Sequence, residues 1–100
     1  MAVVELTVVC LGTGSTSLSD VVAFVEREIR ASGLTSRLNP MSTTIEGDLS
    51  DIFALVERIH DRLAGEGYGR ISTAIKIDDR RDRPGPRMDA KLKSVEDKLK

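Results

Sequence analysis

The chain contains few of the residues that catalytic and metal sites most often use. Its 100 residues include no tryptophan, one cysteine and one histidine. Cys10 has no partner for an internal disulfide, and one cysteine with one histidine is too few for zinc. His60 has no evident carboxylate or nucleophile to act with, so packing or a place on a helix surface is its simpler role. We therefore expect no catalysis and no metal site.

The chain also has few aromatic residues and almost no net charge. Phe24, Phe53 and Tyr68 are the only aromatic residues, which leaves no stacking platform for bases. The 15 basic and 16 acidic residues give a net charge of -1, which argues against nucleic acid or an anionic membrane as the main partner. No apolar run approaches the roughly 20 residues of a membrane span or resembles a signal sequence. We expect a soluble, cytoplasmic protein.

The length indicates one domain, residues 1–100. A chain of 100 residues, 40% hydrophobic and 31% charged, has enough apolar surface for a single core. Burial is inefficient at this size, so apolar area left on a sheet face would favour self-association. We therefore expect a dimer or a tetramer.

Hydrophobic periodicity predicts the elements. Alternation of apolar and polar residues predicts strands at residues 2–11, 35–39, 42–46 and 70–79. Apolar residues at helical spacing predict helices that start near residues 18 and 49 and end at glycines, and a third at residues 88–99. The order is that of an α+β, ferredoxin-like βαββαβ sandwich with an additional C-terminal helix. Both main helices would cover one face of the sheet, and the other face would be solvated or stacked on a partner sheet.

Two segments carry suggestive side-chain chemistry. Residues 39–47 join a carboxylate, two Thr hydroxyls and an Asn amide, which can pair with a cation and with the edge of a polar heterocycle. The turn at residues 11–17 holds Gly12 and Gly14 and can present N–H groups to an anion or a polar ligand, although a flexible turn is an equally good interpretation. It lacks the third glycine of a dinucleotide fingerprint and the lysine of a phosphate-binding loop.

A charged connector follows the last strand. Its acidic residues Asp78, Asp79 and Asp82 are interleaved with Arg80 and Arg81. This pattern predicts a salt-linked surface more readily than a cation site.

Three blocks in the same order resemble the thiamine-binding protein family, also known as the MTH1187/YkoF-like or UPF0045 group, over nearly the whole chain. They are Leu11-Gly12-Thr13-Gly14 with Ser17 and Ser19, then Pro40-Met41-Ser42-Thr43-Thr44-Ile45-Glu46-Gly47, then Arg70 followed by residues 73–82. Two positions depart from the family pattern. Cys10 stands where a proline is expected, and Ser42 where a glycine is usual in the turn.

The resemblance implies a small ferredoxin-like oligomer that binds thiamine or its hydroxymethylpyrimidine part, with no further cofactor and no catalysis. Glu46 would face the thiazolium, whose charge cannot be removed by deprotonation. The remaining ligand residues would be Asn39, Thr43 and Thr44 at the aminopyrimidine edge, Thr13 and Ser17 from the opposite loop, Met41 as an apolar wall, and Lys76. Lys76 can instead pair with Glu5 across the strands.

Two other functions remain open. In one, the segment from Pro40 to Gly47 builds the subunit interface of a structural or regulatory homo-oligomer without a ligand. In the other, the chain is a small enzyme acting on a phosphorylated metabolite, with the glycine turn as its anion site.

Overall fold

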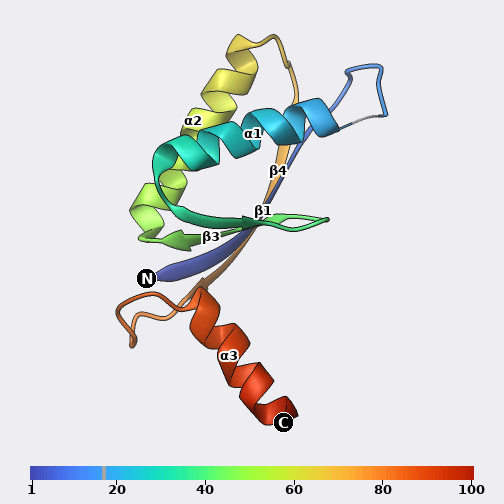
Figure 1. Ribbon diagram of the computed structural model, residues 1–100. Coiled ribbons are helices and arrows are strands. Elements are labelled where there is room, and N and C mark those ends of the chain that lie inside the picture. The colour runs from blue at the N-terminus through green and yellow to red at the C-terminus, as the bar shows by residue number, and fades with distance from the viewer. Residues whose placement is uncertain (17) are drawn as a thin grey trace.

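An antiparallel sheet organises the molecule, with helices α1 and α2 on one of its faces (Figure 1). The computed structural model describes residues 1–16 and 18–100, so the predicted ligand residue Ser17 lies outside the described residues. The elements are β1 (Ala2–Cys10), α1 (Ser19–Ser32), β2 (Thr35–Leu38), β3 (Thr43–Gly47), α2 (Leu49–Gly65), β4 (Ile71–Asp79) and α3 (Met88–Leu99). Their order is the predicted one.

The strands lie in the order β2-β3-β1-β4, and each neighbouring pair is antiparallel. This arrangement confirms the ferredoxin-like fold. β1 pairs with β4 along its whole length, from Ala2 opposite Asp79 to Cys10 opposite Ile71. It pairs with β3 only as far as Leu6, which lies opposite Thr43.

The core lies between the sheet and the two main helices. Alternation along β1 buries its even-numbered residues, and one stripe of each helix packs on them. The buried core residues are Ala2, Val4, Leu6, Val8, Cys10, Val21, Val25, Ile29, Ile45, Ile52, Leu55, Ile59 and Leu63. Burial raises the pKa of the Cys10 thiol, which agrees with the predicted role of this residue as a small apolar side chain.

The turn between β2 and β3 forms without a left-handed residue. The Asn39 N–H donates to the Ser42 carbonyl at 2.8 Å and closes the turn around Pro40 and Met41. Among the described residues, only glycines have positive φ, so Ser42 takes an ordinary backbone conformation. Serine in place of glycine is therefore compatible with the turn.

The connector before α3 is salt-linked, as predicted. Arg80 pairs with Asp82 at 2.6 Å, and Arg81 pairs with Asp79 at 2.9 Å. The hydrogen bond from Arg80 holds the pKa of Asp82 well below its usual range.

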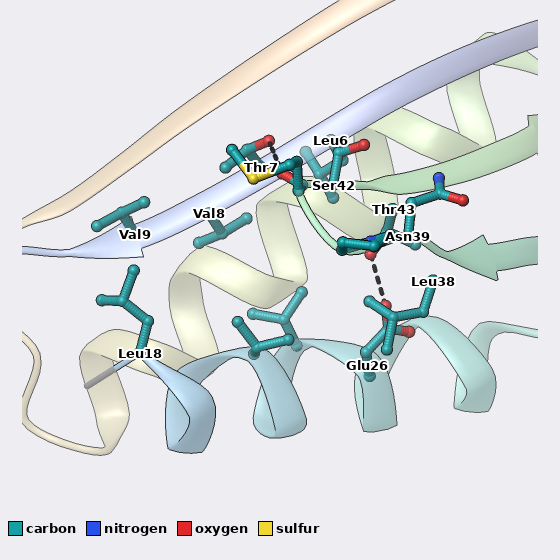
Figure 2. A pocket seen from close by; sticks show the side chains of 14 residues that line it. Leu6, Thr7, Val8, Val9, Leu18, Glu26, Leu38, Asn39, Ser42 and Thr43 are labelled. Carbon is teal, nitrogen blue, oxygen red and sulfur yellow. Dashed lines mark hydrogen bonds between the residues drawn. The ribbon is translucent and has the colours of Figure 1, made fainter.

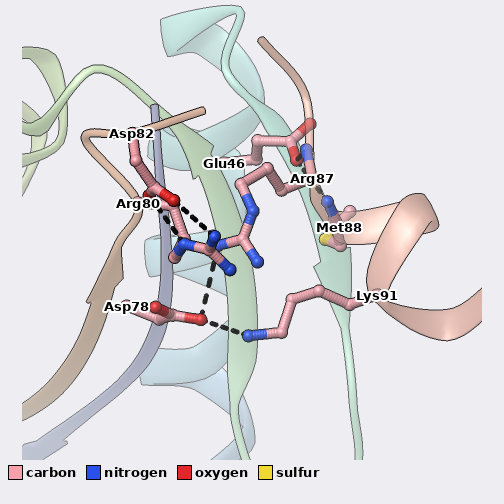
Figure 3. Close-up of polar contacts among 7 residues, drawn as sticks. All are labelled: Glu46, Asp78, Arg80, Asp82, Arg87, Met88 and Lys91. Atoms are coloured by element: carbon pink, nitrogen blue, oxygen red, sulfur yellow. Dashed lines mark hydrogen bonds and ion pairs between the residues drawn. The ribbon is translucent and has the colours of Figure 1, made fainter. Parts of the chain in front are cut away.

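Helix α3 projects from the end of the sheet opposite to residues 11–16 (Figure 1). The side chain of Glu46 anchors its first turn. Glu46 Oε2 accepts hydrogen bonds from the backbone N–H groups of Arg87, at 2.6 Å, and Met88, at 2.5 Å (Figure 3). These groups have no partner within the helix, and the positive end of the helix dipole favours a carboxylate. Glu46 is thereby 7% exposed, although it lies on the open face of the sheet.

Asp78 adds a second attachment. It pairs with Lys91 and, at 3.5 Å, with Arg87, so two residues of the α3 region are tied to β4 (Figure 3). The hydrogen bond from Lys91 lowers the pKa of Asp78 below its ordinary value. Beyond the buried Met88, the apolar residues of α3 remain exposed, with Leu92 at 48% and Val95 at 57%. The first turn of α3 is therefore the part that the rest of the chain holds.

Replacing Glu46 with Gln tests this anchor. Gln keeps one acceptor oxygen but lacks the charge, and a hydrogen bond to a charged group contributes about 1.5–3 kcal/mol. We expect hydrogen exchange at the Arg87 and Met88 amides to become roughly tenfold faster or more, since about 1.4 kcal/mol corresponds to a factor of ten. Glu5→Gln removes an exposed carboxylate from the same sheet face and is the control. Equal exchange in the two variants would contradict the anchoring role of Glu46.

Candidate functional site

A cavity of about 320 Å³ lies where β1 extends beyond the end of β3 (Figure 2). Three segments form its walls: the second half of β1, the first turns of α1, and the turn that joins β2 to β3. The lining residues are Leu6, Thr7, Val8, Val9, Leu18, Val22, Val25, Glu26, Leu38, Asn39, Pro40, Met41, Ser42 and Thr43. The wall is mainly apolar, as is usual for small-molecule sites.

The apolar pattern of α1 explains one wall. Val25 points into the core and is 6% exposed, but Leu18 and Val22 from the same helical stripe are 41% and 37% exposed. They remain exposed because the β2–β3 hairpin ends before it reaches them, so no strand of this hairpin covers them. The cavity thus occupies a place where a longer hairpin would complete the core.

Glu26 is the buried charge in this wall. It is 7% exposed, and its Oε1 accepts a hydrogen bond from the Thr43 hydroxyl at 2.5 Å (Figure 2). A buried carboxylate is costly unless polar groups compensate it, and one hydroxyl uses only one of its several acceptor positions. Glu26 therefore has capacity to accept further hydrogen bonds or to face a cation from within the cavity.

Glu26 was missing from the residues predicted for the site. It stands in a charged run, Glu26-Arg27-Glu28, which usually indicates a solvated helix face. The signal that identifies it is its spacing, because it follows Val22 by four residues and so lies on the same face of the helix. A carboxylate on the apolar face of an amphipathic helix is the pattern to look for.

Three of the predicted residues, Asn39, Met41 and Thr43, do line the cavity. Met41 is at the rim and is 86% exposed, and its carbonyl lies 3.5 Å from the Thr7 hydroxyl. The Asn39 side chain donates to the Thr44 hydroxyl at 2.9 Å. Of the three, Thr43 is therefore the residue tied directly to the buried charge.

The expectation of a single pocket that also holds Thr44, Glu46 and Lys76 is wrong. Successive residues of a strand point to opposite faces of the sheet, so Thr43 faces the helices while Thr44 and Glu46 face the open side. Thr44 and Lys76 line a separate hollow of about 160 Å³ on that side. Lys76 lies directly opposite Glu5, the cross-strand placement predicted as its alternative role.

The glycine turn is also separate from the cavity. Thr13 lines a small hollow of about 100 Å³ that also contains Asp20 and Tyr68. Its hydroxyl interacts within the turn, at 3.3 Å from the backbone N–H of Ser15. Gly12 and Gly14 have φ of +74° and +75°, a conformation that favours glycine. Leu18 lines both the hollow and the cavity, so the two are adjacent.

His60 has a structural partner. Its Nε2 lies 2.6 Å from the Thr73 hydroxyl, between α2 and β4. Within residues 1–16 and 18–100, no cluster of three or more His, Cys, Asp or Glu side chains is placed to hold a metal ion. None of the helices described there is both long and apolar enough to cross a membrane.

Comparison with known proteins identifies the family. The model of the family described as thiamine-binding protein matches residues 4–96. A UPF0045 protein of Staphylococcus xylosus is 41% identical over 100 residues, which cover 96% of this chain and 92% of the relative. A UPF0045 protein of Methanothermobacter thermautotrophicus is 37% identical, covering 99% of this chain and 100% of the relative. The chain belongs to the thiamine-binding protein family, as the three sequence blocks indicated.

Solved structures share the fold. Protein MJ1052 of Methanocaldococcus jannaschii is 29% identical, with a TM-score of 0.82 and coverage of 94% of each chain. A Thermotoga maritima protein named for thiamine biosynthesis or salvage has a TM-score of 0.77 at 20% identity, covering 94% of this chain and 97% of that one. These similarities support the predicted ferredoxin-like arrangement.

Thr43 and Thr44 provide a matched test of the buried hydrogen bond, since they are adjacent in β3 but face opposite sides. Thr43→Val preserves the shape of the side chain and leaves Glu26 without its donor, which should cost about 1–3 kcal/mol of the free energy of unfolding. Thr44→Val removes a partly exposed hydroxyl and should cost less. Urea denaturation measures both. A Thr43 variant no less stable than the Thr44 variant would contradict the role assigned to the Thr43–Glu26 bond.

Proposed function

We propose that the cavity at the end of the β2–β3 hairpin binds thiamine or its hydroxymethylpyrimidine part, without catalysis and without a further cofactor. The observation that carries this proposal is the buried carboxylate of Glu26 in a mainly apolar cavity of about 320 Å³. Pockets for small molecules have volumes of roughly 300–1,000 Å³ and a few polar groups on apolar walls.

The charge of thiamine suits this cavity. Its thiazolium is a fixed cation that cannot lose its charge by deprotonation, so burying it requires a nearby anion. Glu26 supplies the carboxylate that the sequence pattern had assigned to Glu46. Oε2 of Glu46 already accepts backbone hydrogen bonds from Arg87 and from Met88, the first residue of α3. Met41 and the apolar side chains of α1 would cover the remaining ring surface.

The comparisons support the ligand class. The family is described as thiamine-binding, and a protein of the same fold is named for thiamine biosynthesis or salvage. The proposal includes a cytoplasmic location and self-association through the open sheet face, where α3 also leaves apolar side chains exposed. Sedimentation would test the association, and a monomer at all concentrations would contradict that part.

Titration calorimetry and thermal shift with thiamine and hydroxymethylpyrimidine test the ligand. Thiamine at about 100 times its dissociation constant should add roughly 2.7 kcal/mol to the free energy of unfolding. Hydroxyethylthiazole alone should bind more weakly, because it lacks the aminopyrimidine ring and carries no fixed charge. The absence of any shift with millimolar thiamine or hydroxymethylpyrimidine would refute the proposed function.

Two carboxylate variants distinguish the candidate sites. Glu26→Gln should weaken thiamine binding by about 10- to 100-fold, which corresponds to loss of an interaction worth about 1.5–3 kcal/mol. It should affect the uncharged hydroxymethylpyrimidine less. Glu46→Gln, on the other face, should leave the affinity for thiamine unchanged. The opposite result for the two variants would place the ligand on the open face and overturn the assignment to this cavity.

A further inference from the structure

Val8 lies in the part of β1 that pairs with β4 but extends beyond the end of β3. The β1–β3 pairing ends at Leu6, whereas the β1–β4 pairing continues to Cys10. Val8 also lines the cavity. A strand without a neighbour on one side presents N–H and C=O groups that a partner can use. The free edge of β1 and the cavity therefore coincide at this residue.

The direction of the hydrogen bonds along β1 shows which groups face the cavity. In an antiparallel pair, residues alternate between those that bond to the strand on one side and those that bond to the other. The Leu11 N–H donates to the Arg70 carbonyl at 2.9 Å, so the odd-numbered residues of β1 bond toward β4. The even-numbered residues bond toward β3. At Val8, in the part of the chain that the structure describes, no β3 residue lies opposite.

We propose that the backbone N–H and C=O of Val8 recognise the aminopyrimidine ring of the ligand, an inference that rests on the proposed function. The ring places an acceptor nitrogen beside an exocyclic amino group, which is a donor. The Val8 N–H would donate to the ring nitrogen, and the Val8 carbonyl would accept from the amino group. The ring thus takes the place of the next strand in the ladder.

Glu26 and Val8 then have different tasks. They lie on opposing walls of the cavity, Glu26 on α1 and Val8 on β1 (Figure 2). The carboxylate faces the fixed cation, and the strand edge reads the donor and acceptor of the pyrimidine. A peptide strand fits this edge less well than a ring. Only residues 7–10 of β1 lack a strand on the β3 side, and the β2–β3 turn lies at one end of this short segment.

Two thiamine analogues test the recognition of the ring. In one, an oxygen replaces the amino group, so the exocyclic donor becomes an acceptor and the ring nitrogen becomes a donor. In the other, a pyridinium replaces the thiazolium and the aminopyrimidine is unchanged. We expect the pyridinium analogue to bind about as well as thiamine and the oxygen analogue to bind at least about tenfold more weakly, because its groups oppose those of Val8.

The outcomes separate the two proposals. If thiamine and the oxygen analogue bind equally, the recognition by Val8 is wrong and the proposed function stands. If neither thiamine nor hydroxymethylpyrimidine binds, both fail. If the pyridinium analogue alone is rejected, the thiazolium and not the pyrimidine determines the specificity, which also overturns the inference.

Hydrogen exchange at single amides provides a direct measurement. The Val8 amide should exchange rapidly in the free protein and at least about tenfold more slowly when saturated with thiamine, because the ligand supplies its acceptor. The Val4 amide is the control, since Val4 already lies opposite Ile45 in the ladder and should change little. Tight binding of thiamine without added protection at Val8 would overturn the inference and leave the proposed function intact.

Discussion

The unequal lengths of the strands determine where this molecule can hold a ligand. β1 and β4 have nine residues each, but β3 has five and β2 has four. The hairpin turns at Pro40, which has no N–H to contribute to a ladder. Residues 7–10 of β1 are consequently left without a strand on one side, and the apolar face of α1 beneath them is left partly uncovered. The cavity, its buried carboxylate and its free backbone edge all follow from this single difference.

The two buried carboxylates, Glu26 on α1 and Glu46 on β3, lie on opposite faces of the sheet. The alternation of side chains along β3 directs Glu46 to the open face and Thr43, the partner of Glu26, to the helix-covered face. Glu46 lies on the open face, where the backbone N–H groups of Arg87 and Met88 both donate to one of its oxygens. Glu26 lies on the helix-covered face, with the Thr43 hydroxyl as its partner. A carboxylate engaged at a helix N-terminus is less available to a cationic ligand than one held by a single hydroxyl. The geometry therefore favours Glu26.

Much of the fold could be predicted from the sequence, because periods of two and of three to four residues are local properties. The site could be predicted only in part. The cluster at residues 39–47 predicts that Asn39, Met41 and Thr43 lie together, as they do in the cavity wall, but the same clustering predicts that Glu46 joins them. Burial of Glu46 depends on α3, which is about forty residues away in the chain. Glu26 was not predicted: its spacing places it on the apolar face of α1, but only the tertiary structure shows that β3 ends before it covers that face.

The two polar groups to which the proposal assigns ligand recognition lie on regular elements, Glu26 on α1 and Val8 on β1. The residues of α1 next to Glu26 pack into the core, which fixes the helix. The position of Val8 is fixed because β1 pairs with β4 along its full length. Groups fixed in this way lose little conformational freedom when a ligand binds, so more of the interaction energy remains as affinity. Met41 at the rim is 86% exposed, so its side chain can adapt to the ligand. We expect such a site to discriminate between ligands that differ in the rings facing Glu26 and Val8, and to tolerate differences in the part of the ligand near Met41.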